Sequence, residues 1–157
     1  MNQNNQRVQI TPVGYRQLVS ELEELKKIKL PEAIERLARA RDFGDLSENA
    51  EYHSAKGDLG SLEGRAEELQ DIISRAQVVD LKKTANQEVS IGSIVHIEVN
   101  GAQHEFNIVG EWEADPAAKK ISLESPLGKA LMGKKSGDTV EVEAPAGKVI
   151  YLIKGLK

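Results

Sequence analysis

The feature that most constrains the fold is a regular spacing of apolar side chains between residues 55 and 76. They recur at alternating intervals of four and three: Ala55, Leu59, Leu62, Ala66, Leu69, Ile73 and Ala76. This alternation predicts an α-helix with a narrow apolar seam that is buried against one partner helix. Alanines that alternate with leucines favour a close approach of the two helices.

A second amphipathic stretch precedes this helix and supplies the partner. Thr11 can cap it, and Pro12 can occupy the first helical position, where its missing N–H is harmless. Apolar residues then recur at spacings of three and four, first as Tyr15, Leu18, Leu22 and Leu25 and then, one step out of phase, as Leu30, Ile34 and Leu37. We expect Pro31 to kink or briefly break the helix near this change of phase.

Only a few residues separate the two helical stretches, so they must form an antiparallel hairpin. At a rise of 1.5 Å per residue, about 30 residues make an arm about 45 Å long. The second helix contains Gly57, Gly60 and Gly64, each of which costs about 1 kcal/mol in a helix interior. Packing along the seam, rather than intrinsic helix propensity, is therefore expected to hold the arm together.

The pattern changes after residue 80. Residues 93–110 alternate between apolar and polar around Asn100-Gly101, which is a strong signal for a β-hairpin. Residues 139–156 predict a second pair of strands, and the intervening "SPLGKALMGKKSGD" predicts a short helix and loop. The expected fold class is α+β, with a helical arm in residues 1–80 followed by a small, mostly antiparallel sheet with one short helix in residues 81–157.

Charge and composition exclude several classes of function. Residues 1–80 carry 11 basic and 15 acidic residues (11 − 15 = −4), and residues 81–157 carry 10 of each, for a net charge of zero. A mildly acidic chain is poorly suited to holding duplex DNA by phosphate neutralisation, so any nucleic acid is expected to be held by another protein. The chain has no cysteine, which excludes disulfides and thiolate metal sites. Without a signal peptide or a membrane-length apolar run, we expect a cytoplasmic protein with no membrane association.

The stretch "RDFGDLSENAEYH" lies between the two helices. Gly44 is expected to end the first helix in the left-handed backbone conformation. Asp45 and Glu48 have the spacing of a capping box, with Asp at the N-cap and Glu at N3 of the second helix. The same two carboxylates could bind Mg²⁺, which usually takes one or two protein carboxylates together with water and phosphate oxygens. The two interpretations are compatible, and two carboxylates are too few for a tight site unless a partner completes it.

Several motifs resemble those of a known family. "ARDFGDLSENAEYHSAK", followed by "EGR" and "AQVVD", is similar to the tip region of the bacterial Gre transcript cleavage factors, and "GDLSENAEY" resembles the GreA branch in particular. "ISLESPLGKALMGKKSGDTVEVEAPAG" resembles the second domain of the same family. The resemblance covers nearly the whole chain.

The resemblance implies a fold and a mechanism. It implies an antiparallel coiled coil followed by an FKBP-like domain that anchors on bacterial RNA polymerase beside its secondary channel. The tip, residues 44–48, would then reach the polymerase active site, where a backtracked RNA 3′ end is held. Asp45 and Glu48 match the paired tip acids of the family, which help to hold the second Mg²⁺ and a water jointly with the polymerase. The polymerase itself hydrolyses the transcript, so we expect a monomeric elongation factor that is not an enzyme.

Four further residues are candidates for contacts with RNA or polymerase. Arg41 and Lys56 flank the tip and could lie against the extruded RNA 3′ segment, although either could equally belong to a solvated helix face. Ser125 and Pro126 form an exposed corner in a region that the family turns toward the polymerase, or else an ordinary loop before the short helix. Ser47 replaces a basic residue of some relatives, which predicts a weaker contact with RNA.

Three other functions remain open from the sequence. A Gre-like protein could occupy the secondary channel without stimulating cleavage, but such a protein should have an altered tip, whereas this one keeps both acids. An FKBP-like fold also suggests a prolyl isomerase, which needs an aromatic-lined pocket, and residues 81–157 contain only Phe106, Trp112 and Tyr151 as aromatic side chains. A coiled-coil scaffold would be insensitive to neutralisation of the tip.

Overall fold

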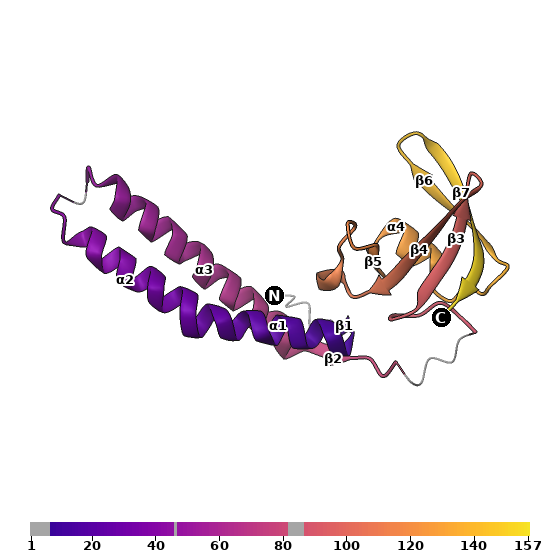
Figure 1. Cartoon of the computed structure of the whole chain (residues 1–157), viewed down its shortest axis with the longest axis horizontal. Coiled ribbons are helices and arrows are strands. Elements are labelled where there is room, and N and C mark those ends of the chain that lie inside the picture. The colour runs from indigo at the N-terminus through magenta and orange to yellow at the C-terminus, as the bar shows by residue number, and fades with distance from the viewer. Residues whose placement is uncertain (1–6, 46, 82–86) are drawn as a thin grey trace, which may run out of the picture. The chain divides into compact units, whose positions relative to one another are not determined.

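Figure 1 shows the computed structural model of the chain, which describes residues 7–45, 47–81 and 87–157. The described residues form two compact units. One is the helical arm, Arg16–Arg75, and the other combines the described residues up to Tyr15 with those from Ala76 to Lys157. Helices and strands are both present, so the α+β fold class predicted from the sequence is confirmed.

The arm is a helical hairpin. Its first limb runs without interruption through α1 (Pro12–Glu24), the π-helix η1 (Leu25–Lys29) and α2 (Leu30–Arg41). Its second limb is α3 (Ala50–Arg75), which lies beside α2 in Figure 1. The buried residues of α3 are Ala55, Ala66, Leu69 and Ile72. Three of these four belong to the predicted seam, so its position on the helix is confirmed, although Ala76 lies in a short strand beyond the end of α3.

A π-helical turn explains why the apolar pattern of the first limb changes phase. The Leu30 N–H donates to the Leu25 carbonyl, five residues earlier, so this turn holds one residue more than an α-helical turn. Pro31 follows this turn as the second residue of α2. The irregularity predicted near Pro31 is therefore present as the π-turn directly before it, and the limb continues as a helix to Arg41.

One predicted seam residue of the first limb is wrong. Ile34 is 55% exposed, whereas Ala40 is 1% exposed. After the π-turn the inward-facing positions are Leu30, Ala33, Leu37 and Ala40. The seam therefore takes a step of three residues from Leu30, which places small Ala33 rather than the bulkier Ile34 toward α3.

The glycines of α3 offer a test of what stabilises the arm. A Cβ atom added at Gly60 would have no heavy atom within 4 Å. We therefore expect Gly60→Ala to raise the free energy of unfolding by about 1 kcal/mol, because alanine restricts the unfolded chain and favours the helix. Urea denaturation followed by circular dichroism measures the change.

A glycine with a crowded surrounding is the matched control. A Cβ at Gly128 in α4 (Pro126–Leu131) would lie 2.0 Å from the carbonyl oxygen of Ser122, so Gly128→Ala should lower the free energy of unfolding. A destabilising Gly60→Ala would show that this side of α3 is packed against other atoms in solution.

The second unit is built on a five-stranded sheet of order β5-β4-β3-β7-β6. Its strands are β3 (Ile94–Val99), β4 (Ala102–Val109), β5 (Lys120–Ser122), β6 (Thr139–Ala144) and β7 (Gly147–Leu156). All neighbouring strands are antiparallel except β4 and β5, which are parallel. Asn100 and Gly101 form the turn between β3 and β4 with φ of +51° and +77°, so the predicted hairpin is confirmed. The second predicted strand pair, β6 and β7, and the short helix α4 are also present.

The core of this unit lies between the curled sheet and α4. Leu131 of α4 is fully buried and packs with Val95, Ile97, Ile108 and Ile153 of the sheet. Ile97 and Ile153 are direct partners in the β3–β7 ladder. The short helix thereby covers the apolar face of the sheet, as the alternating pattern of the strands requires.

Two short strands, β1 (Val8–Ile10) and β2 (Ala76–Val78), form a parallel pair. The sequence alone does not reveal this pair, because each strand has only three residues. Next to β1, the Thr11 hydroxyl accepts a hydrogen bond from the Gly14 N–H at 3.1 Å, which confirms the predicted helix cap. None of the helices in the described part of the chain is long and apolar enough to cross a membrane.

Candidate site at the tip of the arm

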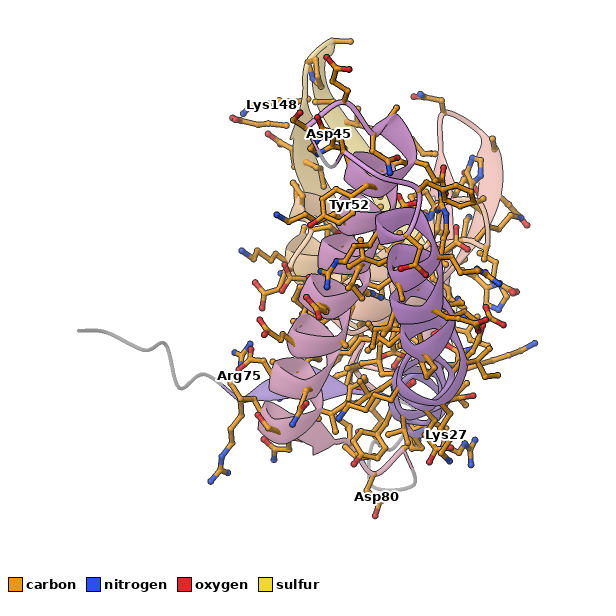
Figure 2. The ribbon with its side chains drawn as sticks, turned by 90° about the vertical axis from the view of Figure 1, so that its left-hand side faces the viewer. Lys27, Asp45, Tyr52, Arg75, Asp80 and Lys148 are labelled. Carbon is orange, nitrogen blue, oxygen red and sulfur yellow. The ribbon has the colours of Figure 1, made fainter. Side chains whose placement is uncertain are left out.

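Residues 42–49 connect α2 to α3 and form the tip of the arm. The Phe43 N–H donates to the carbonyl of Ala40 at 3.3 Å, and Gly44 then takes a left-handed backbone with φ of +112°. The predicted left-handed backbone of Gly44 is confirmed, but α2 ends at Arg41 with Asp42 as its C-cap, so Gly44 lies beyond the end of the helix. Figure 2 shows Asp45 at this end of the hairpin, with Tyr52 on the adjoining turns of α3.

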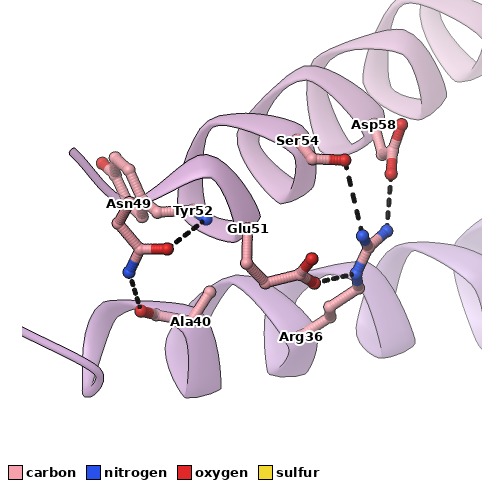
Figure 3. A network of polar contacts seen from close by, with 7 residues as sticks. All are labelled: Arg36, Ala40, Asn49, Glu51, Tyr52, Ser54 and Asp58. Carbon is pink, nitrogen blue, oxygen red and sulfur yellow. Dashed lines mark hydrogen bonds and ion pairs between the residues drawn. The ribbon is translucent and has the colours of Figure 1, made fainter. Parts of the chain in front are cut away.

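Asn49 is the residue that begins α3. Its Oδ1 accepts a hydrogen bond from the Tyr52 N–H at 3.0 Å, and its carbonyl accepts from the His53 N–H at 3.2 Å. Its Nδ2 also donates to the Ala40 carbonyl at 2.7 Å, as Figure 3 shows. Asn49 is therefore the N-cap, and Tyr52 occupies the N3 position.

The predicted capping box of Asp45 and Glu48 is consequently wrong. Helix α3 begins at Ala50, so both acids precede its N-cap. Asn caps a helix as well as Asp does, and at position 49 its amide can also reach the end of α2, which Asp45 does not do. The sequence contains this signal, since Asn49 stands directly before the helix-favouring "AEY", but the Asp-x-x-Glu spacing obscures it.

Asp45 forms a local turn with Ser47. Its Oδ1 accepts hydrogen bonds from the Ser47 N–H at 3.0 Å and from the Ser47 hydroxyl at 2.8 Å. These two bonds, the backbone one first, hold the pKa of the Asp45 carboxyl below its ordinary value, because they stabilise the charged form. Glu48 is exposed, and no hydrogen bond or ion pair joins its side chain to another residue that the structure describes.

Ser47→Ala tests this turn. The variant loses the hydroxyl bond and keeps the N–H bond, so the pKa of Asp45 should rise part of the way toward its ordinary value. Because a lowered pKa favours the folded turn only while the carboxyl is charged, this contribution is present above the ordinary pKa of Asp and disappears as the pH falls through the lowered one. NMR titration of the Asp45 carboxyl carbon measures the shift. An unchanged pKa would contradict the turn.

Arginines neutralise many acids along the arm. Arg36 of α2 binds Glu51 at 2.7 Å and Asp58 at 2.5 Å, and Arg65 of α3 binds Glu21 at 2.8 Å. The hydrogen bond from Arg36 lowers the pKa of Glu51. Asp45 and Glu48, in contrast, have no ion-pair partner within residues 7–45, 47–81 and 87–157, so their charges are available to an external cation.

The four predicted contact residues fall in two regions. Arg41 is the last residue of α2 and Lys56 lies in α3, and both are exposed near the tip. Ser125 and Pro126 belong to the unit that carries the sheet. The Ser125 hydroxyl accepts from the Gly128 N–H at 3.0 Å and donates to the Ser122 carbonyl at 2.7 Å, so Ser125 caps α4, whereas Pro126 is exposed. The polymerase contact of these two residues stays a prediction.

The donor set of the tip suits a shared magnesium site. Within the described residues, no group of three or more His, Asp or Glu side chains is arranged to hold a metal ion. Asp45 and Glu48 offer exposed carboxylate oxygens, which are the ligands that Mg²⁺ prefers. Two such ligands fit a site that a partner must complete.

Comparisons with known proteins agree with this architecture. The family model "Transcription elongation factor, N-terminal" matches residues 8–78. The model "Transcription elongation factor, GreA/GreB, C-term" matches residues 83–157. Together the two models account for both the arm and the sheet.

Individual relatives match over almost their full length. Transcription elongation factor GreA of Rhodospirillum rubrum is 45% identical over 148 residues, covering 93% of this chain and 94% of the relative. GreA of Francisella tularensis subsp. novicida is 46% identical over 152 residues, covering 95% of each. Among solved structures, GreA factor homolog 1 of Thermus thermophilus is 29% identical with a TM-score of 0.46, covering 97% of this chain and 99% of that one. From its sequence matches, the chain belongs to the GreA/GreB family of transcription elongation factors.

Proposed function

We propose that this protein enters the secondary channel of bacterial RNA polymerase and stimulates cleavage of the RNA 3′ end in backtracked complexes. In this proposal the unit that carries the sheet anchors on the polymerase, with Ser125 and Pro126 at the contact. Arg41 and Lys56 lie beside the extruded RNA. The protein acts as a monomer in the cytoplasm and contributes ligands, whereas the polymerase carries out the hydrolysis.

The observation that carries the proposal is that the two acids at the tip have neither a capping role nor an ion pair among the described residues. Asp45 and Glu48 cap neither helix, and neither has an ion-pair partner among the described residues. Exposed carboxylates that neither cap a helix nor form an ion pair are suited to binding an external cation. The arm that presents them has about 30 residues in its first limb and therefore a reach of about 45 Å.

Each acid has a distinct part in this proposal. Asp45 is held by Ser47 through one oxygen, Oδ1, so its carboxylate is oriented while Oδ2 takes no part in these two bonds. Glu48 is the more mobile ligand, since no described side chain fixes it. A Mg²⁺ held jointly by these acids and the polymerase would activate a water and stabilise the phosphoryl oxygens of the scissile bond.

A magnesium titration of cleavage tests the proposal. Backtracked elongation complexes are incubated with and without the protein, and the rate of RNA shortening is measured as the Mg²⁺ concentration is varied. The protein should raise the maximal rate and lower the Mg²⁺ concentration that gives half of it, because it adds ligands for the weakly held ion. A protein that binds the complexes and leaves the rate unchanged would instead be a secondary-channel binder without cleavage activity.

A further inference from the structure

Asn49 joins the ends of the two helices at the tip through a single side chain. Its Nδ2 donates to the Ala40 carbonyl at 2.7 Å, and its Oδ1 accepts from the Tyr52 N–H at 3.0 Å. Figure 3 shows both bonds, with the side chain of Asn49 between α2 and α3. Both bonds are partly buried, unlike the exposed hydrogen bonds that Asp45 forms with Ser47.

The bond from Tyr52 satisfies an N–H that the helix start leaves without an intrahelical partner, and the bond to Ala40 adds to the one that this carbonyl accepts from the Phe43 N–H. The Ala40 carbonyl lies in the last turn of α2 and the Tyr52 N–H in the first turn of α3. Ala40 and Ala55 are each 1% exposed, so the helices approach closely beneath the turn. The amide of Asn49 fits this space because it carries a donor and an acceptor on one short side chain.

The Asn49–Ala40 bond closes the turn that contains both acids. Asp45 and Glu48 lie between the two residues that it joins, so the bond restricts the positions that their carboxylates can reach. Fixing the ends of a loop removes conformations from it, and a pre-positioned group gains in rate because less ordering is needed at the reaction step.

The hydrogen bonds and ion pairs that Arg36 forms between the helices do not close this turn. Arg36 of α2 binds three residues of α3, namely Glu51, Asp58 and Ser54. These contacts join the two helices before the turn rather than across it, and the ion pairs are exposed. Exposed ion pairs contribute little to rigidity or stability. The Asp45–Ser47 bonds lie within the turn, whereas the side chain of Asn49 joins the turn to the end of α2.

We propose that Asn49 is a positioning residue that holds the acids of the tip in the arrangement needed for cleavage. This inference rests on the proposed function. Its chemical basis is the donor half of the amide: the acceptor half only starts α3, whereas the donor half ties the turn to α2.

Asn49→Asp separates the two halves. Aspartate caps the helix as well as asparagine, so the start of α3 should be retained, and the melting temperature should fall only by the contribution of the lost bond to Ala40. Its carboxylate cannot donate to the Ala40 carbonyl, so the closing bond is lost. Asn49→Ser removes the same bond without adding a charge. Serine also caps a helix, and its side chain is too short to reach the Ala40 carbonyl of α2.

Two measurements are made on these variants. Cleavage in backtracked complexes gives the maximal rate at saturating protein and the concentration for half of that rate. Backbone ¹⁵N relaxation of the free protein gives the order parameters of Asp45, Ser47 and Glu48. We expect both variants to lower the maximal rate about tenfold, to leave the half-saturating concentration nearly unchanged and to lower the order parameters. Arg65→Gln, which removes an ion pair between the helices far from the tip, is the control and should change none of the three.

The outcomes separate this inference from the proposed function. If the wild-type protein stimulates cleavage and both Asn49 variants match its maximal rate, the positioning role is overturned and the proposed function stands. A drop in rate without a drop in the order parameters also overturns it, because Asn49 would then act by another route. A wild-type protein that stimulates no cleavage overturns the proposed function and this inference together.

Discussion

Asp45→Asn combined with Glu48→Gln should lower stimulated RNA cleavage at least about 100-fold, which corresponds to about 2.7 kcal/mol of transition-state stabilisation. Both amides keep the size of the side chains and remove the negative charge that a magnesium ligand needs. The fold should survive, because an Asn at position 45 retains an acceptor for the two Ser47 hydrogen bonds and Glu48 has no described partner to lose. Cleavage of backtracked complexes and thermal melting of the free protein are the two measurements.

Asp42→Asn is the matched control for this pair. Asp42 is exposed at the end of α2 and lies in the same turn, but the proposed mechanism gives it no ligand role. Its neutralisation should leave most of the activity. Equal losses in the control and in the double variant would attribute the effect to the general charge of the tip rather than to metal binding. Full activity of the double variant would rule out the donation of ligands by these acids.

Leu69→Ala should lower the free energy of unfolding of the arm by roughly 2–5 kcal/mol, which is the usual cost of replacing a buried leucine by alanine. Leu69 is 0% exposed in α3 and belongs to the seam. The arm has few other large buried side chains, so a cavity at this position removes a substantial part of its packing. Urea denaturation followed by the helical circular dichroism signal gives the change.

Ile34→Ala is the control for Leu69→Ala, since it removes an aliphatic side chain from the same hairpin. With 55% of Ile34 exposed, the cost should stay within about 0.5 kcal/mol. If Ile34→Ala were as damaging as Leu69→Ala, the seam would follow the spacing predicted from the sequence rather than the one in the structure.

Much of the fold follows from the sequence because its signals are local. The four-three rhythm of α3 places its buried face, and Asn100-Gly101 identifies the β3–β4 hairpin, since few other residues adopt the positive φ angles of that turn. The strands β1 and β2 were not foreseeable in the same way. Each has three residues, and their pairing joins segments far apart in the chain, which no local pattern encodes.

At the tip, the local sequence pattern offers two candidates for the N-cap of α3. Asp45 and Asn49 are both good N-caps, and a spacing rule cannot choose between them. The choice depends on the Ala40 carbonyl, to which the side chain of Asn49 donates and that of Asp45 does not. This contact in turn depends on how closely the two helices approach. That both acids lie between the two helices was predictable from the sequence, whereas their place before the N-cap of α3 was not.

The π-turn of the first limb also sets the direction in which the tip faces. In an α-helix each residue advances the chain by 1.5 Å and turns it by about 100°. Adding or removing one residue therefore barely changes how far the arm extends, but it rotates everything beyond that point about the helix axis. The extra residue at Leu25–Lys29 keeps the distal part of α2 facing α3 after such a rotation. In this arm, reach and orientation are therefore set by different features. The number of helical turns sets how far the acids lie from the base of the arm, and the π-turn sets the rotation of the distal part of α2 about the helix axis.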